Sequence, residues 1–293
     1  MMTTGADISC IWPAGAILGE GPLWDEREGA LYWVDIKAPA VHRYHPASGG
    51  RTTWPMPEMI GCIAKRRRGG FVAAFQSGFA FLDPARGQVE RIGNPEPELK
   101  GNRFNDGKCD PAGRFWAGSM DDALVWPTGW LYRLDRDLSW ERVDGGYVCT
   151  NGPAFSPDGR TIYHNDSSGR TVYAYDLSAA GQVANKRVFA RFGKGEGVPD
   201  GMTTDNDGCV WICHWDGWRI TRFRPDGTID RVIPMPVARV TSCAFGGPGF
   251  DTLYVTSAST GLDATALARQ PLAGGLFAFQ PGVRGAAEPD FAG

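Results

Sequence analysis

Short apolar runs alternate with polar turns along almost the whole chain, at a regular interval. The runs are rich in aromatic and β-branched residues, which favour strands. They begin at residues 31, 71, 115, 162, 210 and 253, so successive runs are 40 to 48 residues apart. A repeat of this length, built from short strands, is typical of a β-propeller. The pattern therefore predicts an all-β, six-bladed propeller with four-stranded blades, and a single domain over residues 1–293.

A short phrase precedes each apolar run, and a polar turn separates the two. The clearest copies of the phrase begin at Glu20, Asn151 and Asp200, and weaker copies begin at Ile60, Asn105 and Thr241. In a propeller the first strand of each blade lines the central channel. If the copies are equivalent, these six positions lie in a ring at one mouth of the channel.

The two ends of the chain complement each other. The last repeat is one strand short, and residues 6–12 form a short apolar stretch before the first phrase. We expect residues 6–12 to supply the missing outer strand, because closing the ring removes two free sheet edges. Longer insertions at residues 121–128 and 258–271 are expected at the rim of the channel, and the second is compatible with a short helix.

Composition and charge narrow the possible partners. Gly 40 and Pro 21 make up about a fifth of the chain, as many tight turns require. The net charge is −3, and the one basic cluster, residues 65–68, falls in a predicted turn. We interpret that cluster as a solvated turn rather than a polyanion site, and expect neither nucleic acid nor membrane partners. The predicted protein is cytoplasmic, because no secretion signal is evident.

The cysteines and histidines offer no recognisable catalytic or metal-binding set. Seven cysteines are scattered along the chain, and the close pair Cys209 and Cys213 is interpreted as buried thiols rather than a metal or redox site. The histidines lack ligand spacing. His42 and His45 are expected at the surface, and the remaining two are expected to be packed in second strands. The signatures of α/β-hydrolases, zinc proteases and P-loops are missing.

Oxygen-bearing side chains occupy four of the six ring positions. Glu20, Asn105, Asn151 and Asp200 would place two carboxylates and two amides at one mouth of the channel. Such a set suits a hard or borderline divalent cation, which would also offset the repulsion between the carboxylates. The alternative is turn chemistry, since Asn and Asp before Gly are common in turns. Four aligned side chains favour a site.

Arg103 precedes Asn105 by two residues. A guanidinium at the mouth of an acidic site could bind a substrate oxygen or stabilise negative charge that develops during a reaction. The alternative is a surface arginine that pairs with a nearby acid.

Four phrases together resemble the regucalcin/gluconolactonase family, and most closely bacterial sugar-acid lactonases acting on xylonolactone or arabinolactone. They read LGEGPLW, NRFNDGK, TNGP and PDGM, at residues 18–24, 102–108, 150–153 and 199–202. This resemblance implies a six-bladed propeller that holds one divalent cation, Ca²⁺, Zn²⁺, Mn²⁺, Mg²⁺ or Fe²⁺. The implied metal ligands are Glu20, Asn151 and Asp200.

The resemblance also implies roles in catalysis. Asp200 would act as the base for the attacking water, and Arg103 and Asn105 fall on substrate-binding positions. A substrate-contacting Glu of the family aligns with Ala123, and the neighbouring Asp122 is the candidate replacement.

The expected reaction is hydrolysis of a sugar lactone, such as xylono-, arabinono-, galactono- or gluconolactone, to the aldonic acid. Two alternatives stay open: a broader esterase like the paraoxonases, and a non-catalytic calcium-binding or interaction propeller. The expected partner is a small-molecule lactone, and the expected state is a monomer or weak homo-oligomer.

Overall fold

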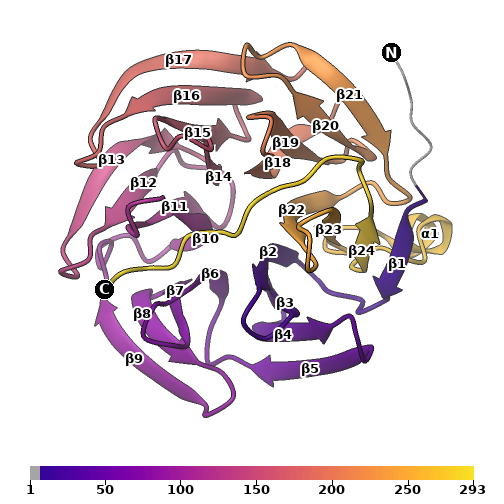
Figure 1. Ribbon diagram of the computed structural model, residues 1–293, viewed down its shortest axis with the longest axis horizontal. Helices are drawn as coiled ribbons and strands as arrows, with labels where there is room; N and C mark the ends of the chain where they lie inside the picture. The colour runs from indigo at the N-terminus through magenta and orange to yellow at the C-terminus, as the bar shows by residue number, and fades with distance from the viewer. Residues whose placement is uncertain (1–6) are drawn as a thin grey trace.

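The computed structural model describes residues 7–293, which form six four-stranded antiparallel sheets arranged around a common central axis (Figure 1). The predicted six-bladed propeller is confirmed. Blades 1 and 2 contain β2 Gly19–Asp25, β3 Ala30–Asp35, β4 Ala40–His45, β5 Gly50–Pro55, β6 Ile60–Lys65, β7 Phe71–Phe75, β8 Gly78–Asp83 and β9 Gln88–Gly93. Blades 3 and 4 contain β10 Asn102–Cys109, β11 Phe115–Asp121, β12 Gly129–Leu134, β13 Trp140–Tyr147, β14 Thr150–Phe155, β15 Thr161–Asp166, β16 Thr171–Leu177 and β17 Val183–Arg191. Blade 5 contains β18 Val198–Thr204, β19 Val210–Trp215, β20 Arg219–Phe223 and β21 Ile229–Pro234.

The sixth blade joins the two ends of the chain. It contains β22 Val240–Gly246, β23 Thr252–Ser257 and β24 Leu276–Phe279, and its outer strand is β1 Ser9–Trp12. Strand β1 pairs antiparallel with β24, with Cys10 opposite Phe277. The prediction that an N-terminal strand closes the ring is therefore confirmed. The insertion before β24 contains the short helix α1 Ala264–Arg269.

The innermost strands share one irregularity, which falls at the repeated phrase. Strands β2, β6, β10, β14, β18 and β22 each show a register shift against the next strand of their blade. In β2 the shift lies between Glu20 and Leu23, and in β14 it lies between Asn151 and Ala154. A bulge bends a strand and re-aims its side chains. Gly21 and Gly152 have φ of 53° and 75°, a backbone conformation that glycine adopts readily.

Buried aspartates in two polar turns each bind side chains of their own blade. Asp110 accepts hydrogen bonds from the Trp116 indole at 2.9 Å and from Arg114 Nε at 2.6 Å. Asp205 does the same in blade 5, from Trp211 at 2.8 Å and Arg222 Nε at 2.7 Å. The polar turns of the repeat are thus partly internal, and their carboxylates satisfy buried indole and guanidinium donors.

Two sequence interpretations are wrong for one residue each, although Arg67 and Arg68 of the basic cluster do lie in an exposed turn. Lys65 does not lie in a solvated turn: it ends β6, is fully buried, and its amine pairs with Glu26 and Asp290. His42 is not a surface residue either. Its ring is buried and stacks on Trp33, with the ring centroids 4.0 Å apart. In both cases strand position overrides the polar character of the side chain.

The C-terminal segment, residues 280–293, crosses the propeller as a strap (Figure 1). Glu288 pairs with Lys108, near the end of β10. Phe291 is fully buried, and its backbone N–H donates to the carbonyl of Lys65 at 2.7 Å. Lys65 and Lys108 stand at the far ends of inner strands that begin near the repeated phrases. The strap therefore lies at the channel end opposite to the predicted ring.

Candidate active site

The four predicted ring residues lie at the bulges of their inner strands, and all are buried. Glu20, Asn105, Asn151 and Asp200 have exposed fractions of 3 to 5%. The two other positions of the ring, Ile60 and Thr241, are also buried and complete it without charge. The bulge common to the inner strands thus places polar groups from four blades at one channel mouth.

Hydrogen bonds connect Asn105 and Asn151, two of these residues, in a continuous chain. Arg103 Nη1 donates to Asn105 Oδ1 at 2.6 Å, and Asn105 Nδ2 donates to Asn151 Oδ1 at 2.9 Å. Asn151 Nδ2 then donates to Ser167 Oγ at 2.9 Å, and Ser167 donates to the carbonyl of Pro199 at 2.6 Å. The order of donors fixes both amide orientations, so that Asn151 Oδ1 keeps one lone pair for another partner.

Glu20 and Asp200 lack a cationic partner. Among the described residues, no Lys, Arg or His nitrogen lies within 4.0 Å of either carboxylate. Burial, together with repulsion from Asp200 and Asp106, raises the pKa of Glu20 well above its usual range. Burial and the charge of Asp106 raise the pKa of Asp200 in the same way. Because buried charges normally need partners, this donor set fits a divalent cation held by two carboxylates and an amide oxygen.

A charged cluster stands beside the ring. Arg103 is buried, and its Nε donates to Asp122 Oδ1 at 2.6 Å. Lys37 Nζ donates to both oxygens of Asp122, at 2.6 and 2.7 Å. Burial favours the protonated form of Asp122, but hydrogen bonds from Lys37 and Arg103 lower its pKa overall. Arg103 therefore does pair with an acid, as the alternative interpretation held, but inside the channel mouth rather than on the surface.

Comparison with known proteins decides the family. Residues 18–259 match the SMP-30/gluconolactonase/LRE-like region. The chain is 40% identical over 288 residues to the 6-deoxy-6-sulfogluconolactonase of Pseudomonas putida, covering 98% of this chain and 99% of the relative. It belongs to the SMP-30/gluconolactonase family. It is also 40% identical over 280 residues to the L-arabinolactonase of Azospirillum brasilense, covering 94% and 92% of the two chains.

A solved structure of this family resembles the present one over nearly its whole length. The crystal structure of regucalcin from Agrobacterium tumefaciens, described as a calcium-binding protein, superposes with a TM-score of 0.93 at 28% identity. The superposition covers 99% of each chain. Among residues 7–293 of this family member, no helix is long and apolar enough to cross a membrane.

Sequence reasoning missed Asp106, a third carboxylate of the site. Asp106 accepts hydrogen bonds from the backbone N–H groups of Gly107 at 2.8 Å and Gly152 at 3.2 Å. Burial raises the pKa of Asp106 to about 7, although the charge of Lys108 acts against that rise. The residue follows Asn105 in the repeated phrase, and the bulge of β10 turns both side chains inward. A signal was present, since Asn-Asp-Gly places two polar side chains next to each other.

The histidines of second strands are packed, as predicted. His164 is fully buried and meets Tyr147 edge to face, with ring centroids 5.1 Å apart. His214 Nδ1 lies 2.7 Å from the carbonyl oxygen of Glu196. Burial lowers the pKa of both histidines to about 4. The cysteines of the described chain are unpaired, and Cys209 and Cys213 are buried.

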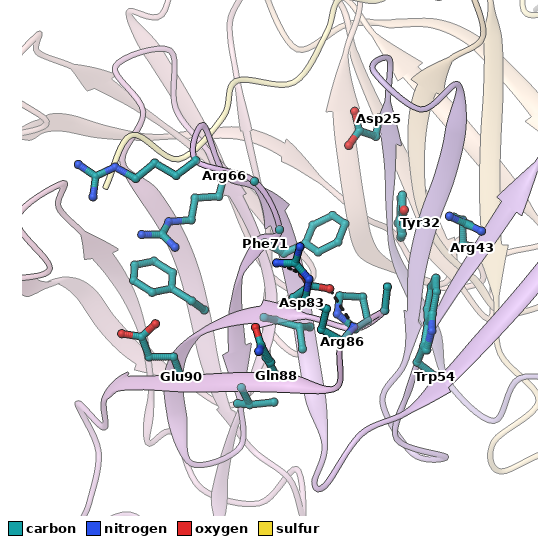
Figure 2. A pocket seen from close by; sticks show the side chains of 18 of the residues that line it. Asp25, Tyr32, Arg43, Trp54, Arg66, Phe71, Asp83, Arg86, Gln88 and Glu90 are labelled. Atoms are coloured by element: carbon teal, nitrogen blue, oxygen red, sulfur yellow. Dashed lines mark hydrogen bonds and ion pairs between the residues drawn. The ribbon is translucent and has the colours of Figure 1, made fainter.

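A cleft of about 1010 Å³ opens between blades 1 and 2, and none of the ring residues lines it. Figure 2 shows its side chains, which include Asp25 at the end of β2 and Trp54 on β5. Most of its arginines are already paired: Arg43 lies 3.3 Å from Glu28, and Asp83 likewise pairs with an arginine of the cleft. The cleft lacks the unpartnered buried carboxylates of the channel mouth, and we place the candidate site at the mouth.

Proposed function

We propose that this family member hydrolyses a sugar lactone to the aldonic acid, with one divalent cation held by Glu20, Asn151 and Asp200. The observation that supports the proposal most directly is the buried pair Glu20 and Asp200, which has no cationic partner among the described residues. Two relatives at 40% identity are named as lactonases of sugar acids, which supports an aldonolactone as substrate.

A bound cation would supply Lewis-acid chemistry at the lactone carbonyl. The proposed role of Asp200 is that of a base. It takes a proton from the water that attacks the carbonyl carbon, and the carbonyl electrons move onto oxygen. When the ring C–O bond breaks, Asp200 returns the proton to the departing ring oxygen. The water oxygen and its second hydrogen stay in the carboxylic acid group of the product, so atoms and charge balance.

Arg103 is the proposed group for the developing negative charge. Its Nε and Nη1 are engaged by Asp122, Asn105 and the carbonyl of Phe104. Its Nη2 donates no hydrogen bond within residues 7–293, which leaves donors for a substrate oxygen. Both amide hydrogens of Asn105 are used, on Thr150 and Asn151. We therefore propose that Asn105 mainly positions Arg103 and Asn151, and offers substrate a single lone pair on its Oδ1.

The experiment is acid release from a panel of xylono-, arabinono-, galactono- and gluconolactones. Chelator-treated protein is compared with protein reloaded with Ca²⁺, Zn²⁺, Mn²⁺, Mg²⁺ or, anaerobically, Fe²⁺. The proposal expects cation-dependent hydrolysis of at least one lactone, faster than its spontaneous opening. No acceleration with any cation would contradict the proposal and favour a binding protein, as the description of the Agrobacterium structure as calcium-binding suggests for that relative.

A further inference from the structure

The ion pair between Lys37 and Asp122 bridges two blades that are not neighbours. Lys37 lies in the turn between β3 and β4 of blade 1, and Asp122 directly follows β11 of blade 3. In their blades, Gly19 pairs with Asp35 and Asn102 pairs with Asp121. Both charged residues therefore stand at the end of the propeller where the ring residues begin their strands. Blade 2, between them, contributes the apolar Ile60 to the ring (Figure 1).

The bridge is joined to the candidate active site through Arg103. Asp122 accepts from Lys37 and from Arg103 Nε, and the other end of the guanidinium donates to Asn105. Exposure rises along this path: the side chain of Arg103 is 5% exposed, that of Asp122 28% and that of Lys37 31%. Lys37 is thus the outermost cation of the network.

Two cations meet one carboxylate in this network. Two cations, Lys37 and Arg103, share the single carboxylate of Asp122. The ammonium of a lysine has three donors, and both hydrogen bonds of the Lys37 ammonium go to Asp122. One donor of a partly exposed ammonium has no acceptor among the described residues.

We propose that Lys37 is a specificity-determining residue, which selects lactones with an anionic group, a carboxylate or sulfonate, at the end of the sugar away from the lactone carbonyl. This inference rests on the proposed function. The anion would receive the third N–H of Lys37 in a charge-assisted hydrogen bond, with Asp122 holding the ammonium in place. A neutral hydroxymethyl group at the same position would form a much weaker hydrogen bond with Lys37.

The test uses two substrates that differ at one carbon. Galactaro-1,4-lactone carries a carboxylate at C6, where galactono-1,4-lactone carries a hydroxymethyl group. We expect the wild type to favour the galactaro compound in kcat/KM. Lys37→Gln should lower kcat/KM for it about 30-fold, mainly through KM, and change that of the neutral lactone less than about threefold. Lys37→Arg, which keeps the charge, should retain most of the preference.

Two results would overturn the proposal. An equal loss for both lactones in Lys37→Gln would mean that Lys37 only positions Asp122 and Arg103. If the wild type shows no preference for the charged lactone, Lys37 does not determine specificity. Calorimetric binding of galactarate and galactonate to cation-loaded protein measures the same preference without turnover. If no lactone is hydrolysed but galactarate binds more tightly through Lys37, the proposed function fails and the charge selection stands.

Discussion

Asp200 is proposed both to bind the cation and to act as the general base, and one substitution separates these roles. Asp200→Asn keeps the size of the side chain and an oxygen that a cation can bind, but it removes the basic carboxylate. We expect kcat to fall by about a thousandfold at a saturating concentration of the working cation, because a positioned general base contributes on the order of 10²–10⁴. Acid release at saturating cation measures the loss, and calorimetry gives cation affinity.

The partner variant Glu20→Gln is the control for Asp200→Asn. It removes the other carboxylate of the set, which we assign to cation binding alone. Its activity should therefore recover in large part as the cation concentration is raised, whereas that of Asp200→Asn should not. If Asp200→Asn keeps more than a tenth of wild-type kcat with cation bound, the base is another group, and Asp106 is the next candidate.

His164 is a residue whose burial makes stability depend on pH. Neither ring nitrogen of His164 has a hydrogen-bond partner within residues 7–293, and burial lowers its pKa to about 4. The usual histidine pKa is about 6.5. Below that pH the His164 ring binds a proton in the unfolded chain but stays neutral in the folded chain. The stability contributed by the neutral ring is complete above pH 6.5 and is lost as pH falls toward 4. The free energy of unfolding falls by up to about 3 kcal/mol over this pH range.

We therefore predict that His164→Leu reduces the sensitivity to acid. Leucine has a similar volume and no polar atom to leave unsatisfied, so stability at pH 7.5 should change by less than about 1 kcal/mol. The loss between pH 7.5 and 5 should shrink. Urea midpoints at the two pH values are the measurement, and the half-exposed His45, substituted by Gln, is the matched control. An unchanged pH slope in His164→Leu would contradict the assignment.

At the scale of the strand, the bulges of neighbouring blades fit closely together. A Cβ added to Gly61 on β6 would lie 2.3 Å from the carbonyl oxygen of Asn105 and 2.6 Å from that of Phe104. Such overlap with backbone cannot be relieved by a rotamer change. We expect Gly61→Ala to cost about 1–3 kcal/mol in the free energy of unfolding and to reduce activity, since Asn105 must move.

Gly101 offers a nearby control for Gly61. A Cβ there would make one ordinary contact, 3.5 Å from a carboxylate oxygen of Asp121. Gly101→Ala should change unfolding by less than about 0.5 kcal/mol. Urea denaturation of both variants, together with lactone hydrolysis, measures the effect. Equal stability of the two variants would show that β6 and β10 can separate without cost.

Strand periodicity made the blades predictable, because alternation and turns are local properties of the sequence. The ring positions were predictable for the same reason. A bulge recurs at each repeated phrase, so the residues that open the phrases lie at the same end of the inner strands. Asp106 was missed because the bulge breaks the alternation of side chains just where it matters. Lys37 was missed because its partner, Asp122, lies 85 residues away and in another blade.

At the scale of the whole molecule, contacts between distant segments account for the error at Lys65. The strap at residues 280–293 has no strand pattern, and its place is set by single anchors such as Phe291 and the pair of Glu288 with Lys108. Lys65 was assigned to a solvated turn because Asp290, one of its partners, lies 225 positions further along the chain. No local pattern carries information about such pairs.

The proposed cation would join parts of the ring that the strands do not connect directly. Glu20, Asn151 and Asp200 belong to blades 1, 4 and 5, so one ion would link blades across the channel. Without it, two buried carboxylates repel each other and oppose folding at neutral pH. Ligand that binds the folded chain alone stabilises it by about 2.7 kcal/mol at a hundredfold excess over Kd. Global unfolding, and not just local order, should therefore respond to the cation.

We predict that thermal unfolding of chelator-treated protein at pH 7.5 shifts upward when the working cation is added. For a domain of this size, 2.7 kcal/mol corresponds to roughly 5 °C or more. Glu20→Gln should be more stable than the wild type without cation, because it removes one of the two repelling charges, and it should gain less from the cation. The substitution thus raises the stability of the cation-free protein but reduces the gain in stability when the cation is added. General stabilisation by divalent salt would not produce this combination. A wild type and a Glu20→Gln variant that shift equally would place the cation somewhere other than this ring.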